Sequence, residues 1–308
     1  MTHRGNAENR ITRRLFTKKL TLGAAAVRVS GLFPGGVSAG ALPRKRRIVV
    51  MSDIHVGRVA DDQDGAVWLG HSMDDIRRHV DAVDYGLTLG DITHEGDRAS
   101  LERYLALRDR SNVPRWFQLA GNHEYRNGGI RHYLELIGDT RPYLFVDGNI
   151  VWIFLSDERK RVSGNLTYHS YLWIKENLDK HRDKIIVFCS HQLPPNTLRR
   201  SDEAIFCIHP TKWITELLTE YPITLYLCGH EHHQPYSGEN ILIRDGTTYI
   251  NVASVNHAYG TGASGSLILE FEEGAHHIIA RRRNHDAQSF EKARRISIPT
   301  AKSIALDR

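Results

Sequence analysis

Short, uninterrupted apolar runs alternate along this chain with segments of helical spacing, and this alternation constrains the fold more than any other feature. The apolar runs lie at residues 47–52, 85–89, 116–120, 150–155, 184–190 and 225–228, and the helical segments at 65–82, 99–109, 130–137, 168–181 and 211–220. Continuous apolar strands separated by helices are typical of α/β folds whose sheets are covered on both faces. Further strands without intervening helices, at 248–252 and 267–271, predict an antiparallel end to the sheet system.

Metal-binding side chains follow five of these apolar runs, each at the point where the run ends. They are Asp53 and His55, Asp91, Asn122 and His123, His191, and finally His230 and His232. Ligands of open α/β sheets bind outside the carboxyl ends of the strands, so these side chains are expected to converge on one rim. One such residue after a strand is usually a turn or capping residue, but five coincident groups favour a shared site.

The spacing and the donor chemistry of this set are consistent with a metal site. Residues i and i+2 of an extended segment point the same way, which would aim Asp53 and His55 at a common centre. Carboxylate, amide and imidazole donors without thiolates suit Zn²⁺, Mn²⁺ or iron. A set of this size is too large for one tetrahedral ion and suits two ions that share a carboxylate. Gly90, Gly121 and Gly229 stand directly before ligand residues, where glycine permits close backbone approach.

The net charge of +5 comes from the N-terminal segment and not from the rest of the chain. Residues 1–41 hold seven of the 41 basic residues and one of the 36 acidic residues, so the remainder is close to neutral. A near-neutral body argues against general nucleic-acid binding. The arginine cluster at residues 281–283 would bind phosphate or, as is more common for such a run, lie at a solvated strand end.

The first 41 residues resemble a twin-arginine (Tat) export signal. Arg13 and Arg14 are followed by Phe16, a short apolar stretch and an A-x-A-like cleavage site at residues 39–41. Such a signal would bring the folded protein to the periplasm or the outside of the cell through the Tat export machinery. The alternative is a disordered basic N-terminus on a cytoplasmic protein.

Two further features concern membranes and disulfides. No apolar run reaches the roughly 18–20 residues that span a bilayer, so no transmembrane segment is expected in the mature chain. Cys189, Cys207 and Cys228 show no paired spacing, and small buried core residues are expected rather than a disulfide framework.

The last residues, 286–308, are polar and are expected to form a loosely packed tail.

In this order and context the motifs resemble those of the calcineurin-like metallophosphoesterase superfamily. The family pattern D-x-H, G-D, G-N-H-(D/E), H and G-H-x-H corresponds to Asp53-Ile54-His55, Gly90-Asp91, Gly121-Asn122-His123-Glu124, His191 and Gly229-His230-Glu231-His232. The resemblance covers about residues 47–283. It implies a four-layer αββα sandwich of two mixed β-sheets flanked by helices. The chain then divides into an export signal (1–41), a metallophosphoesterase domain (42–285) and the polar tail (286–308).

The resemblance also implies a role for each residue of the set. Asp53, His55 and His232 would bind one metal ion, Asn122, His191 and His230 a second, and Asp91 would bridge both. His123 would be the catalytic residue that stabilises the transition state or protonates the leaving oxygen. The implied activity is hydrolysis of a small phosphate ester by in-line attack of a metal-bridging hydroxide, with manganese, iron or zinc as the metals. His94 is either a substrate contact or an exposed loop residue.

The residue at position 94 bears on the branch of the superfamily. Purple acid phosphatases carry a tyrosine three residues after the bridging aspartate, whereas this chain has His94 there and His55 in the D-x-H motif. The pattern looks more like that of the bacterial cyclic-nucleotide phosphodiesterases, which makes a phosphodiesterase the predicted activity. A phosphomonoesterase and a non-catalytic, metal-bearing binding scaffold are the alternatives. The complete ligand set favours an enzyme, and the absence of a basic, aromatic-interleaved stripe argues against a nuclease.

Overall fold

The computed structural model describes residues 43–60, 63–156, 164–233, 240–257, 263–299 and 302–307. The predicted export signal at residues 1–41 lies outside these ranges. Within them, no helix is both long and apolar enough to cross a membrane. Cys189, Cys207 and Cys228 are buried and form no disulfide, as predicted from their spacing.

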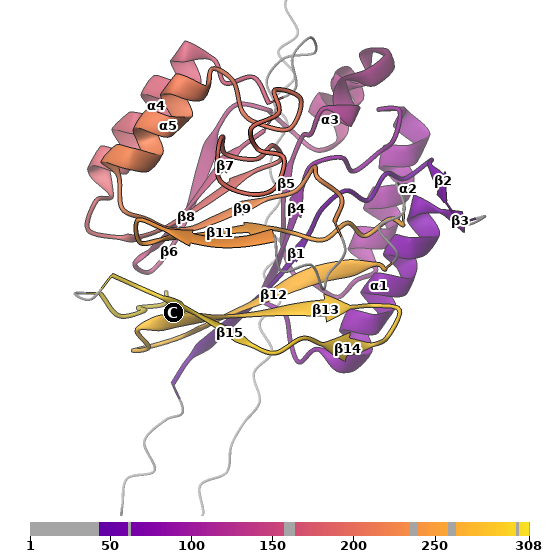
Figure 1. Ribbon diagram of the computed structural model, residues 1–308. Helices are drawn as coiled ribbons and strands as arrows, with labels where there is room; N and C mark the ends of the chain where they lie inside the picture. Colours follow the sequence, from indigo (N-terminus) through magenta and orange to yellow (C-terminus); the bar gives the residue numbers. More distant parts are fainter. Residues whose placement is uncertain are drawn as a thin grey trace, which may run out of the picture. The chain divides into compact units, whose positions relative to one another are not determined.

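Two mixed β-sheets form the centre of the described part of the chain (Figure 1). The first contains, in order, β14 (Ser289–Phe290), β13 (His277–Asn284), β12 (Gly265–Glu272), β1 (Lys45–Met51), β4 (Tyr85–Leu89) and β5 (Trp116–Leu119), with β15 (Arg294–Ser297) beside β13. The second contains β10 (Ile241–Arg244), β11 (Thr247–Asn251), β9 (Ile223–Cys228), β8 (Ile185–Ser190), β7 (Ile150–Leu155) and β6 (Tyr143–Asp147). A short pair, β2 (Val59–Ala60) and β3 (Gln63–Asp64), is separate.

Helices cover the outer face of each sheet, which makes four layers (Figure 1). The helices on the first sheet are α1 (Gly65–His79), α2 (Arg98–Asp109) and α3 (Ile130–Leu136), and those on the second are α4 (Tyr168–Lys180) and α5 (Thr211–Glu220). Strand β1 shows why both faces are apolar. Ile48 and Val50 point into the core between the sheets, whereas Val49 and Met51 point to the helices. The predicted sandwich of two mixed sheets with flanking helices is confirmed.

Helices α1, α2 and α4 begin where short polar side chains cap them. The carboxylate of Asp64 accepts a hydrogen bond from the backbone N–H of Ala66 at the start of α1, at 2.7 Å. Asp97 accepts one from the N–H of Ser100 at the start of α2, at 2.9 Å. Such caps satisfy N–H groups that have no partner within the helix, and they place the helix starts close to the strand ends that precede them.

The predicted antiparallel end of the sheet system is correct for one sheet and wrong for part of the other. Strand β12 pairs antiparallel with both β1 and β13. Strand β11, however, joins β9 in parallel and is antiparallel only to β10. The connection between β9 and β10 includes residues 234–239, which lie outside the described ranges.

The prediction of a loosely packed tail at residues 286–308 is wrong for the residues described there. Strand β15 pairs with β13, and Ile296, Ile298, Ile304 and Leu306 are buried in the core between the sheets. The segment is polar on average, but its buried apolar residues form two pairs spaced by two positions, Ile296 with Ile298 and Ile304 with Leu306. Alternation of this kind buries one face of an extended segment, and the average composition conceals it.

Two of the three arginines at residues 281–283, Arg282 and Arg283, are buried in the interior, whereas the side chain of Arg281 is 43% exposed. Arg283 donates two hydrogen bonds, at 2.8 and 2.6 Å, to the carboxylate of Asp75 on α1. His285 donates a third through Nδ1, at 2.7 Å, and Asp75 is 2% exposed. Burial alone would raise the pKa of the Asp75 carboxyl, but the hydrogen bonds from Arg283 and His285 hold it well below its usual range.

Replacing Asp75 is expected to destabilise the fold strongly. In Asp75→Ala the guanidinium of Arg283 would stay buried without its partner, which typically costs about 3–5 kcal/mol of unfolding free energy. The lowered pKa of Asp75 contributes stability at neutral pH that is lost as pH falls below about 4. Burial lowers the pKa of His285, so its contribution is also lost as pH falls, beginning near pH 6.5.

Urea denaturation of the wild type, of Asp75→Ala and of Asp74→Ala at several pH values would measure these effects. Asp74 is a matched control because it lies on the same helix with a half-exposed carboxylate, and its loss is expected to cost less than about 1 kcal/mol. The difference between wild type and Asp75→Ala should shrink as pH falls. A difference below about 1 kcal/mol at pH 7 would contradict a stabilising role for this cluster.

Candidate metal centre

The predicted ligand residues come together where the carboxyl ends of the central strands of both sheets meet. Strands β1, β4 and β5 are parallel neighbours, as are β8 and β9, so the segments that follow them leave each sheet at one edge. The first sheet supplies Asp53, His55, Asp91, Asn122 and His123, and the second supplies His191, His230 and His232. The two groups are in contact, because His191 Nε2 lies 3.2 Å from Asp91 Oδ2.

One donor set consists of Asp53, His55, Asp91 and His232. One ligand atom from each of these residues lies within 4.8 Å of the others. His232 Nε2 is 3.1 Å from Asp53 Oδ1 and 3.0 Å from His55 Nε2. Two imidazole nitrogens and carboxylate oxygens directed at one small volume form the donor arrangement that binds a cation.

A second donor set shares Asp91 with the first. Ligand atoms of Asp91, His191 and His230 lie within 4.8 Å of one another. The amide oxygen of Asn122 joins them at 3.1 Å from His191 Nε2. The structure therefore brings all seven predicted ligands together and divides them as the sequence motifs suggest, with Asp91 between the two sets.

Backbone hydrogen bonds orient the imidazoles of the second set. His191 Nδ1 donates to the carbonyl of Leu89 at 2.7 Å, which leaves Nε2 directed at Asp91. His230 uses the opposite nitrogen, because its Nε2 donates to the carbonyl of Ile205 at 2.9 Å. Its Nδ1 is buried and makes no hydrogen bond to the described residues. Anchoring of one ring nitrogen by a carbonyl is typical of histidines that bind metals through the other.

The buried polar atoms of the site fit a pair of cations. Asp91 Oδ1 accepts the backbone N–H of His123 at 2.9 Å, but Oδ2 accepts no hydrogen bond from the described residues. Burial lowers the pKa of His55 well below its usual value and that of His230 to about 4, so both imidazoles are neutral at pH 7. Neutral imidazole and unpaired carboxylate oxygen are the forms in which these groups bind a metal.

The explanation offered from sequence for the i, i+2 spacing is wrong. Asp53 and His55 are not in an extended segment, since their φ angles are 53° and 49°. Asp91, His230 and His232 also have positive φ, at 49°, 71° and 52°. Non-glycine residues rarely adopt this conformation, and backbone strain of this kind is concentrated at functional sites. The chain turns sharply after each strand and thereby directs the side chain back over the strand end.

The predicted role of glycine before the ligands has a steric basis at two positions. A Cβ atom on Gly121 would lie 2.3 Å from Asp91 Oδ1. A Cβ atom on Gly229 would lie 1.8 Å from Ser52 Oγ and 2.7 Å from an oxygen of Asp53. Any side chain at these positions would displace a ligand residue, so glycine lets strands from both sheets approach the site.

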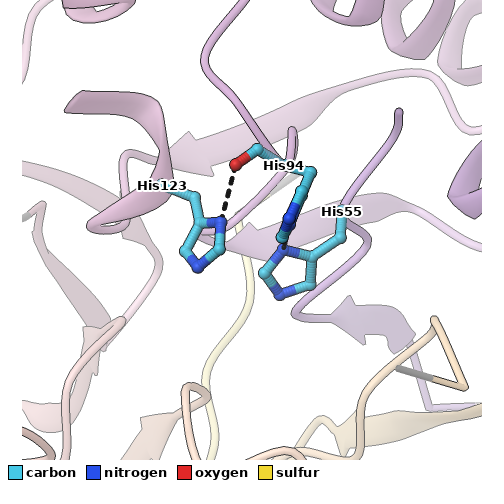
Figure 2. A group of neighbouring side chains, drawn as sticks. All are labelled: His55, His94 and His123. Carbon is cyan, nitrogen blue, oxygen red and sulfur yellow. Dashed lines mark hydrogen bonds between the residues drawn. The ribbon is translucent and has the colours of Figure 1, made fainter. Parts of the chain in front are cut away.

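His123 lies beside the donor sets with its orientation set by a main-chain contact (Figure 2). Its Nδ1 donates to the carbonyl oxygen of His94 at 2.8 Å, and its Nε2 lies 3.8 Å from Asp91 Oδ2. The His94 ring is 4.9 Å from that of His123 and 5.5 Å from that of His55. The His94 side chain lies next to the site and is 17% exposed, and its role as a substrate contact stays a prediction.

Three residues around the site have structural roles that the sequence analysis did not predict. Glu124, within the G-N-H-E motif, is fully buried and accepts the N–H groups of Thr93 and Gly121 at 2.9 and 2.8 Å, and burial next to Asp91 raises its pKa to about 8. Ser254 and Asn256 hold the turn after β1 through the carbonyls of Asp53 and Ile54. The motif position could have identified Glu124, but no local signal distinguishes the other two.

His233, which directly follows the last ligand motif, is buried. It is 6% exposed, and its ring contacts the carbonyl of Asn251 at 2.7 Å and the amide of Asn240. It belongs to the interior of the second sheet and to neither donor set.

Comparison with known proteins agrees with this geometry. The sequence profile of calcineurin-like phosphoesterases matches residues 46–234, which contain every predicted ligand. The chain belongs to the calcineurin-like phosphoesterase family. No curated protein sequence matches it significantly. The predicted membership in the metallophosphoesterase superfamily is confirmed by this match.

One solved structure supports the fold at low sequence identity. A purple acid phosphatase from yellow lupin (Lupinus luteus) seeds is similar with a TM-score of 0.59 and 14% identity, over 83% of this chain and 54% of that one. This chain therefore spans about half the length of the lupin protein. Vps29 from Chaetomium thermophilum aligns with a TM-score of 0.43 and 12% identity, over 82% of this chain and all of that one. At such identities the likeness concerns the fold, and the branch of the superfamily stays a prediction.

Proposed function

We propose that this calcineurin-like phosphoesterase is a phosphodiesterase that uses two adjacent metal ions. The observation that carries the proposal is the position of the buried Asp91 Oδ2. It lies 3.2 Å from His191 Nε2 of one donor set and 3.7 Å from His55 Nε2 of the other. A carboxylate oxygen within reach of both sets suits a ligand that two ions would share.

The donor types support manganese, iron or zinc as the metals. Asp53, His55 and His232 would hold one ion, Asn122, His191 and His230 the other, and Asp91 both. Carboxylate, amide and imidazole donors without thiolates suit these metals. Ions in these positions would supply Lewis acidity toward the phosphate ester and toward water.

The chain's own contribution to the reaction centres on His123. Because Nδ1 is engaged by the carbonyl of His94, Nε2 is the ring nitrogen that faces the donor sets. Because Nδ1–H is donated to that carbonyl, Nε2 holds a proton only in the imidazolium form, which burial disfavours by lowering the pKa of His123. In that form the proton on Nε2 can pass to the leaving oxygen of a bound ester, as in general acid catalysis. The backbone N–H of the same residue holds Asp91 Oδ1, so one short segment positions both the proton donor and the shared carboxylate.

The preference for diesters is supported by the D-x-H motif, in which His55 supplies a ligand and His94 replaces the tyrosine of purple acid phosphatases. Kinetic comparison of the Mn²⁺-loaded full chain on bis-p-nitrophenyl phosphate and p-nitrophenyl phosphate would test it. We expect kcat/KM to favour the diester by at least about tenfold, a difference of about 1.4 kcal/mol in transition-state binding.

Asn122→Ala is the matched control for this comparison, because it removes one ligand of the second donor set and should reduce turnover of both esters. Metal content is measured on the same samples. A preference for the monoester would contradict the diesterase and indicate a phosphatase. Absence of metal-dependent turnover in protein that holds two ions would contradict catalysis on these esters altogether.

A further inference from the structure

A second pocket lies between the two sheet edges formed by β5 and β6. Its volume is about 510 Å³, and it is lined by residues of β5, of the segment from α3 to β6, and of the first turns of α4. No predicted metal ligand lines it, and neither does His94 or His123. Small-molecule pockets in proteins measure roughly 300–1,000 Å³, so this one has room for a compact organic ligand.

Arg115 places a positive charge at this pocket that no acidic side chain among the described residues balances. The described part of the chain offers its guanidinium neither an ion pair nor a hydrogen bond. The group instead lies over the rings of Phe117 and Phe145, at 4.3 and 4.6 Å from their centres. The second arginine of the lining, Arg141, is already paired with Asp139 at 2.6 Å. A cation held in place by aromatic rings and lacking a counter-ion is suited to bind an anion.

The remaining walls of the pocket favour a ring. Trp116 and Trp173 line it together with the apolar side chains of Ile137 and Leu144. Both tryptophans are only partly buried, and the Trp116 ring also packs over Gly86 and donates its N–H to Ser111. Flat aromatic surface next to an oriented charge binds molecules that combine an apolar ring with an anionic group.

The edge of β5 is unsuited to an added peptide strand. The outward carbonyl of Gln118 already accepts hydrogen bonds from the hydroxyls of Tyr133 and Tyr143, at 3.1 and 3.0 Å. A carbonyl oxygen has two lone pairs, so this acceptor is saturated, and strand addition would need it free. The pocket therefore fits a small molecule better than a polypeptide.

We propose that this pocket binds a small organic anion with an apolar ring system, whose anionic group contacts Arg115 and whose ring packs on Trp116 and Trp173. The proposal is independent of the reaction at the metal centre. It predicts that removal of the positive charge selectively weakens the binding of anionic ring compounds. Uncharged compounds of the same shape should bind as before.

Fluorescence titration of the Mn²⁺-loaded full chain with anilinonaphthalene sulfonate, and with the uncharged phenylnaphthylamine of the same ring system, would test this. Arg115→Gln should lower the affinity for the sulfonate by about tenfold or more, the usual range for loss of a charged hydrogen-bonded contact. The affinity for phenylnaphthylamine should stay within about twofold of the wild-type value. Arg115→Lys should retain most of the sulfonate affinity. Arg131→Gln, at an exposed arginine of α3 outside the pocket, should bind both dyes like the wild type.

Three results would overturn the proposal. The first is unchanged sulfonate affinity in Arg115→Gln. The second is an equal loss of affinity for both dyes in Arg115→Gln and in Arg115→Lys, which would indicate damage to the fold. The third is displacement of the sulfonate by inorganic phosphate together with loss of binding after metal removal, which would place the dye at the metal centre.

Discussion

Asp91→Asn is expected to abolish the binding of both metal ions and to lower kcat/KM by at least about 10³-fold, because a single donor that stabilises charge in a transition state is already worth about 10²–10³. The asparagine keeps the size of the side chain and removes the charge. The oxygen that lies between the two donor sets, 3.2 Å from His191 Nε2 and 3.7 Å from His55 Nε2, would lose its ability to bind two cations. Metal analysis of the purified protein and steady-state kinetics on the same samples would measure both effects.

The matched control for Asp91→Asn is Asp109→Asn, which changes an exposed carboxylate at the end of α2. It should retain the metal content and activity of the wild type. Retention of two ions per chain in Asp91→Asn would show that the two sets bind metals without a shared carboxylate, and the proposed binuclear centre would be wrong. Loss of one ion only would assign Asp91 to a single set.

His123→Ala is expected to separate turnover from metal binding. The alanine removes the ring whose Nε2 faces the site, but it leaves the backbone N–H that holds Asp91 Oδ1 at 2.9 Å. Metal content should therefore equal that of the wild type, while kcat falls by about 10²–10⁴-fold, the usual contribution of a positioned proton donor. The loss should be smaller for an ester whose leaving group needs no proton, such as p-nitrophenolate, than for one that leaves as an alkoxide.

His71→Ala on α1 provides the control, since that histidine is exposed and belongs to neither donor set. Kinetics on the two leaving groups and metal analysis would be carried out together. Loss of the metal ions in His123→Ala would assign this residue to metal binding and contradict its role as a proton donor. An equal loss of kcat for both leaving groups would contradict proton transfer as its contribution.

Much of the fold could be predicted from local sequence because its strands are short and buried on both faces. A run such as residues 185–189 is apolar throughout, and only a covered strand or a buried helix accommodates it. Strand β6, whose residues are mostly half-buried, and strand β10, with an exposed arginine at its end, escaped prediction because they lie at sheet edges. Edge strands carry a weaker apolar pattern, since one side faces solvent.

Long-range pairing also escaped prediction. Asp75 and Arg283 are 208 positions apart, and nothing near either residue shows that one neutralises the other. The arginine cluster therefore resembled a phosphate site or a solvated strand end in sequence, although Arg282 and Arg283 are buried. The polar tail was misjudged for the same reason. Its buried isoleucines are recognised as core residues only against the strands that they contact.

The sequence by itself determined the ligand types, their grouping at strand ends and the family, because these depend on short motifs and on an apolar pattern that is read locally. Only the tertiary structure decided which atoms face the centre. His191 presents Nε2 and His230 presents Nδ1, because carbonyls of Leu89 and Ile205 engage the opposite nitrogens. The positive φ angles that aim Asp53 and His55 at one point are likewise imposed by contacts between distant segments. Such contacts form only when the two sheets pack, and no local pattern of residues specifies them.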